Sequence, residues 1–222
     1  QMCIRDSICM NGHKVTSSSA IGSTVYIESN VHVVLTDCKA SGSISNTRSN
    51  GAAGLSSRNS FNYTNSENCT IDLFGVTVSG TGRSVANYTG STVNLYNSTV
   101  SGTKYAIYNT GTVNTAGTVK TTSDTVESGY YCVYNFGTLT VDGTLTANGG
   151  DVGIYNAANK DGSQHGTMTV NGIVTSTGSS NGLSNGGVLA VTGTLTAIGK
   201  NLHGLYNNCL LYTSPSPRDR QK

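Results

Sequence analysis

The stretch Gly137-Thr-Leu-Thr-Val-Asp-Gly-Thr-Leu-Thr-Ala147 decides the fold class of this 222-residue chain. Apolar and polar residues alternate in two runs, Thr138–Val141 and Thr144–Ala147, on either side of Asp142-Gly143. Strict alternation over four or five residues predicts a half-buried β-strand, and threonine suits the pleated surface of a sheet. Asp and Gly between the runs favour a turn. The stretch therefore predicts two short strands joined by a tight corner.

A second motif precedes this stretch and recurs through the second half of the chain. It ends in Asn, and two short alternating runs follow it, so one repeat comprises three short strands. Its Asn residues lie 26, 21, 29 and 22 residues apart, and Asn156–His165 is interpreted as an insertion at one corner. The copies are Ala106–Asn109, Cys132–Asn135, Gly153–Asn156, Gly182–Asn185 and Gly204–Asn207, with a weaker copy at Val85–Asn87.

Three such strands cannot bury a core alone, whereas stacked repeats bury a continuous one. Residues 8–208 are therefore predicted to be all-β, a parallel β-solenoid of roughly seven to eight coils with three short strands per coil. The first half follows the same frame, because Thr70–Phe74 and Thr92–Tyr96 each lead to a Val-Ser-Gly sequence. The Ser- and Asn-rich segment 43–68 is expected to be mostly loop.

Alternation also predicts which side chains point inward. In Ile107-Tyr108-Asn109 the Ile faces the core, the Tyr faces outward and the Asn lies at the corner. Three aliphatic ladders are expected inside the solenoid. The first contains Ile107, Val133, Ile154, Leu183 and Leu205, the second Val113, Leu139, Val141, Met168, Val170, Leu189 and Val191, and the third Val119, Leu145, Val174 and Leu195.

Two polar columns follow from the same alignment. Amide side chains about 4.8 Å apart can hydrogen-bond along a stack. The predicted structural ladder is Asn109, Asn135, Asn156, Asn185 and Asn207. The candidate binding residues are Tyr108, Tyr134, Tyr155 and Tyr206, which share an outer face that Ser184 interrupts. Aromatic rings in a row can stack on sugars or contact a protein partner. The alternative is a cross-strand ladder that only stabilises the sheet.

Three strands per coil, an Asn at a turn and the phrase Val33-Val-Leu-Thr-Asp-Cys-Lys-Ala-Ser-Gly42 resemble the pectin-lyase-like superfamily across most of residues 20–207. The resemblance implies a right-handed parallel β-helix. That superfamily includes polysaccharide lyases and hydrolases, phage tailspikes, and bacterial adhesins and autotransporter passengers. The low charge, 11%, and the abundance of Thr, Asn and Gly are most similar to the adhesin-like members.

The two ends, residues 1–7 and 209–222, are predicted to be translated sequencing-adapter sequence. Met2–Ser7 and Cys209–Ser214 can be encoded by DNA strings that are reverse complements, and these strings resemble a transposase adapter. Such segments are excluded from fold reasoning, and the rest is interpreted as a fragment from an environmental library. A net charge of +2 does not predict nucleic-acid binding, and no apolar run is long enough to span a bilayer.

The remaining cysteines, Cys9, Cys38, Cys69 and Cys132, do not have the spacing of a metal site. Alignment with other coils places Cys38 in an inward slot, so a buried thiol is expected there. A Cys38–Cys69 disulfide is the alternative. The four His residues are isolated, and no metal or cofactor is predicted.

Scattered carboxylates argue against catalysis, which needs titrating groups brought together. The one pair expected on neighbouring coils is Asp37 with Asp72, and no catalytic residue is assigned. We expect a structural or binding repeat region of a bacterial adhesin-like protein, secreted or at the cell surface. Its partners would be polysaccharide or a host or neighbouring cell surface. Alternatives are a purely structural or tailspike-like role, and a polysaccharide lyase or glycoside hydrolase of the same fold whose active site lies outside this fragment.

Overall fold

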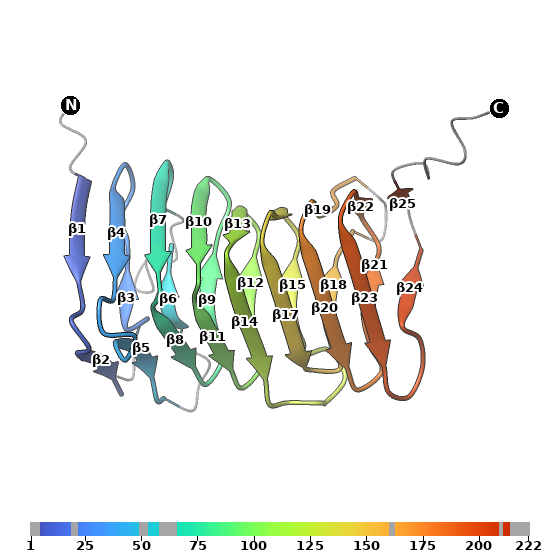
Figure 1. Ribbon diagram of the computed structural model, residues 1–222, viewed down its shortest axis with the longest axis horizontal. Helices are drawn as coiled ribbons and strands as arrows, with labels where there is room; N and C mark the ends of the chain where they lie inside the picture. Colours follow the sequence, from blue (N-terminus) through green and yellow to red (C-terminus); the bar gives the residue numbers. More distant parts are fainter. Residues whose placement is uncertain are drawn as a thin grey trace.

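The computed structural model describes residues 5–18, 22–48, 53–57, 66–159, 163–208 and 211–213. In this part of the chain, successive strands enter three parallel sheets in turn, and the coils follow one another along one axis (Figure 1). Each strand pairs with the strand three places further on, as β10 (Ser91–Tyr96) does with β13 (Thr112–Ala116). The protein is therefore a right-handed parallel β-helix with three strands per coil, as the sequence predicts.

The three sheets are named here by the first strand of each. Sheet 1 contains β1 (Arg5–Cys9), β4 (His32–Thr36), β7 (Cys69–Phe74), β10, β13, β16 (Thr138–Val141), β19 (Thr167–Val170), β22 (Val188–Val191) and β25 (Leu211–Thr213). Sheet 2 contains β2 (Lys14–Ser17), β5 (Ser43–Asn46), β8 (Thr77–Gly80), β11 (Thr99–Gly102), β14 (Thr118–Ser123), β17 (Thr144–Gly149), β20 (Ile173–Gly178) and β23 (Thr194–Gly199). Sheet 3 contains β3 (Val25–Tyr26), β6 (Ala53–Ser56), β9 (Arg83–Asn87), β12 (Tyr105–Asn109), β15 (Tyr131–Asn135), β18 (Val152–Asn156), β21 (Asn181–Asn185) and β24 (Leu205–Asn207).

The core consists of the predicted aliphatic columns. In sheet 3, Ile107 pairs with Val133 and Val133 with Ile154, and all three are completely buried. Leu205 continues this column but is 38% exposed, because its strand is the edge of the sheet. The predicted second ladder is two adjacent columns of sheet 1. Leu139 pairs with Met168 in one column, and Val141 pairs with Val170 in the other. Burying each such side chain contributes about 1.5 to 3 kcal/mol.

Glycines line the corner between sheets 1 and 2, where consecutive coils approach closely. A Cβ atom on Gly172 would lie 2.0 Å from the carbonyl oxygen of Gly143 in the preceding coil. A Cβ on Gly193 would lie 2.0 Å from the carbonyl oxygen of Gly172. The Gly-Thr-Leu phrases of the sequence thus reflect a steric requirement of coil stacking as well as turn formation.

The prediction that segment 43–68 is mostly loop is wrong for two parts of it. β5 and β6 are strands that pair with β8 and β9. Each contributes one large apolar residue to the core, Ile44 and Leu55, while small residues or Asn fill the other positions. Such a strand has little alternation to detect. Residues 49–52 and 58–65 lie outside the described residues.

Parts of the two ends also pair. Arg5–Ser7 belongs to β1, which pairs with β4, and Leu211–Thr213 forms β25, which pairs with β22. Pairing at an open sheet edge uses backbone N–H and C=O groups, which every residue type except proline carries. The adapter origin of these ends therefore stays a prediction.

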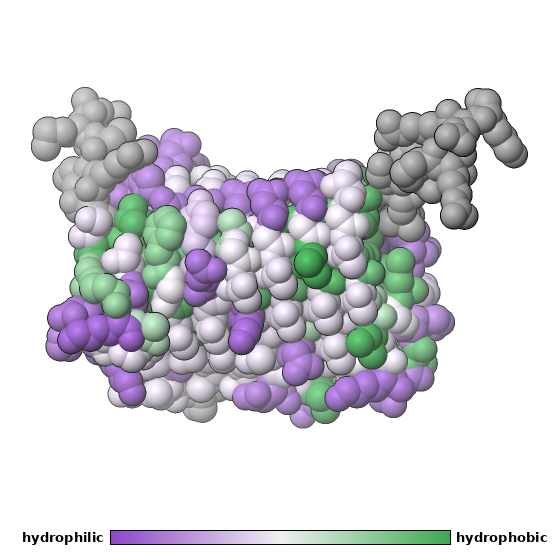
Figure 2. Space-filling view, in the orientation of Figure 1, coloured by the Kyte–Doolittle hydropathy of each residue, from purple (hydrophilic) through white to green (hydrophobic). Residues whose placement is uncertain are grey.

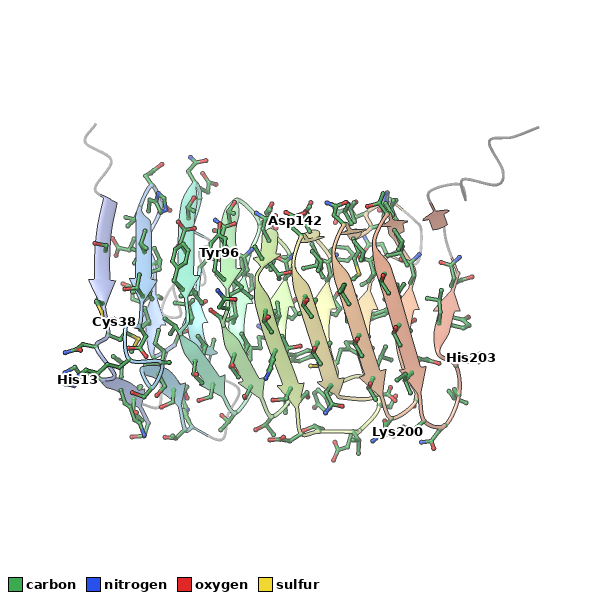
Figure 3. The ribbon with its side chains drawn as sticks, in the orientation of Figure 1. His13, Cys38, Tyr96, Asp142, Lys200 and His203 are labelled. Carbon is green, nitrogen blue, oxygen red and sulfur yellow. A yellow bond between two sulfur atoms is a disulfide. The ribbon has the colours of Figure 1, made fainter. Side chains whose placement is uncertain are left out.

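Cys38 corrects another expectation, because it is exposed and forms a disulfide with Cys9 (Figure 3). Residues 37–42 join β4 to β5, whereas only Gly75 and Val76 join β7 to β8. The longer connection carries Cys38 out of the inward slot that the alignment gave it. Cys69 and Cys132, by contrast, are buried free thiols.

We expect the Cys9→Ser/Cys38→Ser double variant to loosen the first coil only. The disulfide closes a separation of 29 residues, for which chain entropy gives about 3 to 4 kcal/mol. A solenoid can unfold from its end, so the loss should be local. Amide hydrogen exchange should accelerate in β1 and β2 and stay unchanged in β15. Equal acceleration in all three strands would contradict this.

Candidate binding surface

The outer face of sheet 3 carries the tyrosine column that the sequence predicts. This sheet lies behind sheets 1 and 2 in Figure 1. Tyr108 pairs with Tyr134, and Tyr134 pairs with Tyr155 in the next coil. Ser184 and then Tyr206 continue the column. The structure therefore brings Tyr108, Tyr134 and Tyr155 together and separates Tyr206 from them by one coil.

A second column beside the first was missed by the sequence analysis. Strict alternation from Tyr108 would turn Tyr105 inward, but Ala106 and Ile107 both lie in the core and are completely buried. Two consecutive inward residues return Tyr105 to the outer face, where its ring meets that of Tyr131 at 6.2 Å. The repeated Tyr-x-x-Tyr spacing was the available signal.

Tyr88 and Tyr130 lie beside these two columns. The seven neighbouring tyrosines are called the tyrosine face here, and they are Tyr88, Tyr105, Tyr108, Tyr130, Tyr131, Tyr134 and Tyr155. The rings of Tyr108 and Tyr134 are stacked, with centroids 5.0 Å apart and planes 8° apart. Tyr105 meets Tyr108 edge-on, with the centroids 5.8 Å apart. Rings that stack on each other use up their faces, so Tyr108 and Tyr134 present mainly ring edges and hydroxyl groups to a ligand.

Two cations border this face. The guanidinium carbon of Arg83 lies 4.0 Å from the ring centroid of Tyr108, and its Nη1 donates a 2.6 Å hydrogen bond to the hydroxyl of Tyr88. The ammonium nitrogen of Lys104 lies 4.9 Å from the ring centroid of Tyr130. Both are cation–π contacts, which hold the rings in place and add positive charge to one side of the surface.

Burial among other rings raises the pKa of several of these phenols. The pKa of Tyr134 rises to about 12, first through desolvation and then through neighbouring phenol groups, Tyr108 foremost. Desolvation also raises the pKa of Tyr105, which Arg83 opposes, and that of Tyr131. These hydroxyls are therefore neutral at physiological pH and can both donate and accept hydrogen bonds.

We expect alkaline titration to separate these tyrosines from the rest. The pKa of Tyr134 is about 12 when folded and about 10 when unfolded, so the folded protein retains this proton longer. The resulting contribution to stability is complete below pH 10 and is lost as the pH rises towards 12. Tyrosinate absorbance should show a late component that Tyr134→Phe reduces. A single component near the ordinary pKa would contradict this.

The asparagine column forms one continuous chain of side-chain hydrogen bonds at the corner between sheets 3 and 1. Asn109 donates to Asn135 at 2.8 Å, and Asn135 donates to Asn156 at 2.7 Å. Asn156 donates to Asn185, and Asn185 to Asn207, both at 2.7 Å. Asn87, from the weaker copy, extends the column with a donation to Asn109. Apart from Asn207 at its end, no asparagine of this column is more than 1% exposed to solvent, so the column serves the fold.

Sheet 1 carries a smaller aromatic and polar group that the sequence analysis did not single out. The rings of Phe74 and Tyr96 are stacked, with centroids 4.4 Å apart (Figure 3). Beside them, Asn94 donates to the carboxylate of Asp72 at 2.6 Å, and His32 Nε2 lies 2.8 Å from the same carboxylate. These contacts link neighbouring coils.

The expectation that Asp37 and Asp72 lie at equal positions is wrong, because Asp72 pairs with Val34. Asp37 lies in the connection after β4, where its carboxylate accepts hydrogen bonds from the backbone N–H groups of Gly12 and Gly42, at 2.7 and 2.6 Å. These bonds, with that of Gly42 foremost, lower the pKa of Asp37. The carboxylate therefore fixes a loop and is not brought close to a second acid.

The side of the molecule formed by sheets 1 and 2 is mostly of intermediate hydropathy (Figure 2). Its outward positions are largely Thr and Ser, as in the pairs Thr138 with Thr167 and Ser79 with Ser101. In the described ranges, no group of three or more His, Cys, Asp and Glu side chains could hold a metal ion. No helix in the described part of the chain is long and apolar enough to cross a membrane.

The tyrosine face is thus the densest concentration of aromatic side chains in the described structure. Comparisons with protein-family models, with curated proteins and with solved structures find no match.

Proposed function

We propose that the chain is part of a bacterial secreted or surface protein of the adhesin-like, pectin-lyase-like kind, and that its tyrosine face binds glycans. The observation that carries the proposal is the gathering of seven of the twelve tyrosines on one outer face. Tyrosine presents both an apolar ring and a hydroxyl group, which suits it to sugars and to protein surfaces. Weak contacts repeated along a rigid rod would gain strength through avidity.

The rings are already fixed before any ligand arrives. Tyr131 and Tyr155 have centroids 4.6 Å apart, and the guanidinium of Arg83 lies against Tyr108. Preorganised side chains lose little conformational entropy on binding, which favours affinity. An extended glycan running along the axis would meet the rings of successive coils in turn.

The test uses the Tyr134→Ser/Tyr155→Ser variant of the full chain. Binding to a printed glycan array and to insoluble cellulose, chitin, xylan and mannan should fall at least tenfold for every glycan that the wild type binds. The two substitutions remove adjacent rings from the centre of the surface, and their positions are outward, so the core columns remain. Circular dichroism and thermal unfolding should verify the fold.

The matched control is Phe74→Ser/Tyr96→Ser, which removes the stacked aromatic pair of sheet 1. This variant should bind as the wild type does. Glycan binding that survives loss of Tyr134 and Tyr155 in a folded protein would refute the proposal. So would equal losses in the two double variants, because the effect would then not belong to sheet 3.

A further inference from the structure

Two rings of the tyrosine face lie closer together than the register of their strands requires. Tyr155 pairs with Tyr134, and the centroids of these two rings are 5.9 Å apart. The ring of Tyr155 leans instead towards Tyr131, where the centroids are 4.6 Å apart and the planes are tilted by 47°. Both side chains are half-buried, so part of each ring remains accessible to solvent.

The tilt of this pair suits the formation of a bond between the two rings. A carbon–carbon bond between the Cε atoms of two tyrosines lies in the plane of both rings, so the ring edges must meet. Planes tilted by 47° converge on one side, which brings two edges together. The stacked rings of Tyr108 and Tyr134 are only 8° from parallel and present their faces to each other, so one of them must turn before such a bond can form.

The charges around the tyrosine face also favour the tilted pair. The guanidinium of Arg83 lies against the ring of Tyr108, whereas the carboxylate of Asp151 acts on the phenol of Tyr131. Removing an electron from a phenol creates positive charge, which a nearby cation opposes and a nearby carboxylate favours. Tyr131 therefore loses an electron more readily than Tyr108 does.

An oxidant that reaches the described surface meets tyrosine before any sulfur side chain. The chain has no Trp, and the disulfide already holds two of its cysteines. The other Cys and Met side chains of the described residues are at most 6% exposed, and they are Met10, Cys69, Cys132 and Met168. Because oxidation of Cys and Met follows their exposure, the neighbouring phenols are the accessible targets.

We propose that the tyrosine face is a site of oxidative modification, at which a carbon–carbon bond joins the rings of Tyr131 and Tyr155. The co-reactant is hydrogen peroxide, acting through a one-electron oxidant of the haem-peroxidase class. Each phenol gives up one electron and its hydroxyl proton, and the two phenoxyl radicals couple at Cε. The two Cε protons then move to the phenolic oxygens. The peroxide takes up the two electrons and the two released protons and becomes two water molecules.

The bond connects consecutive coils, because Tyr131 belongs to β15 and Tyr155 to β18. It closes residues 131–155 into a covalent ring and restricts the unfolded chain as a disulfide does. Unlike a disulfide, it is not reversed by thiols. The modification therefore strengthens the rod, and it goes beyond the proposed function because it does not depend on whether the tyrosine face binds glycans.

The test treats the folded full chain with a haem peroxidase and hydrogen peroxide. The product is then unfolded, digested with an endoproteinase that cleaves before Asp, and examined by mass spectrometry. This cleavage releases peptide 124–141, which contains Tyr131, separately from peptide 151–160, which contains Tyr155. The main product should be these two peptides joined, with the mass of two hydrogen atoms missing. Fragmentation should place the link on Tyr131 and Tyr155.

Two variants and one control complete the design. Tyr131→Phe and Tyr155→Phe should each reduce the yield of the joined peptides at least tenfold, and either one carries the test if the other misfolds. The control is Tyr96→Phe, which changes a ring of sheet 1 outside the tyrosine face and should leave the yield within twofold of the wild type. Circular dichroism before oxidation should verify the fold of each protein.

Three results would overturn the proposal. The first is the absence of joined peptides in the oxidised wild type. The second is a main product that joins peptide 72–123 to peptide 124–141, because the link would then involve Tyr105 or Tyr108. The third comes from an equal mixture of unlabelled and 15N-labelled chains. Joined peptides that carry one label each would show that the rings couple between molecules and not between the coils of one chain.

Discussion

Asn135→Ala should lower the free energy of unfolding by about 4 kcal/mol. The Asn135 side chain is completely buried, accepts a hydrogen bond from Asn109, and donates to Asn156 and to the carbonyl oxygen of Thr167. Alanine would leave a donor of Asn109 and acceptors of the other two without partners away from water. Each unsatisfied buried group costs about 1 to 3 kcal/mol. Urea unfolding followed by circular dichroism measures the loss.

The same substitution at the end of the column is the control. Asn207 accepts a hydrogen bond from Asn185 but is exposed, so water can replace what alanine removes. Asn207→Ala should therefore cost less than about 1 kcal/mol. If the two variants lose equal stability, the buried chain of amides is not what distinguishes the middle of the column from its end.

Gly172→Ala should cost about 3 kcal/mol through a steric clash and not through lost contacts. The new Cβ would lie 2.0 Å from the carbonyl oxygen of Gly143 and 2.8 Å from that of Asp142, and both atoms belong to the backbone of the preceding coil. No side-chain rotation relieves such a contact, so the coils must move apart and break hydrogen bonds between them. Overpacking in a well-packed interior typically costs 1 to 3 kcal/mol, and occasionally more.

Gly186→Ala provides the comparison, because its nearest neighbours would lie at 3.5 Å, an ordinary contact distance. Its unfolding temperature should stay close to that of the wild type, whereas that of Gly172→Ala should fall. Equal unfolding temperatures would contradict the close approach of coils at this corner.

The repeated motif was sufficient to predict the inward columns and the asparagine chain. Ile154 and Asn156 occupy equal positions in every copy of their motif, and stacking of equal positions requires only that the repeats lie above one another. The same logic placed Tyr108, Tyr134 and Tyr155 in one column. Periodicity is strongest where each coil repeats the last without insertions.

The remaining features depend on the backbone between those positions. Tyr105 shares the face of Tyr108 only because two consecutive residues turn inward, which a strict period of two does not represent. Cys38 leaves the core because its connection is longer than those of later coils. Neither the side on which an extra residue is accommodated nor the partner of Cys38 can be read from spacing alone.

Register between coils has an evolutionary consequence. Since Asn109 and Asn135 occupy equivalent positions, deleting residues 110–135 or duplicating them would join two matching ends and leave every column aligned. Each such event would change the length of the rod by about 4.8 Å. Duplicated coils could therefore act as a spacer that moves the tyrosine face outward by one coil at a time. No amino-acid substitution would be needed.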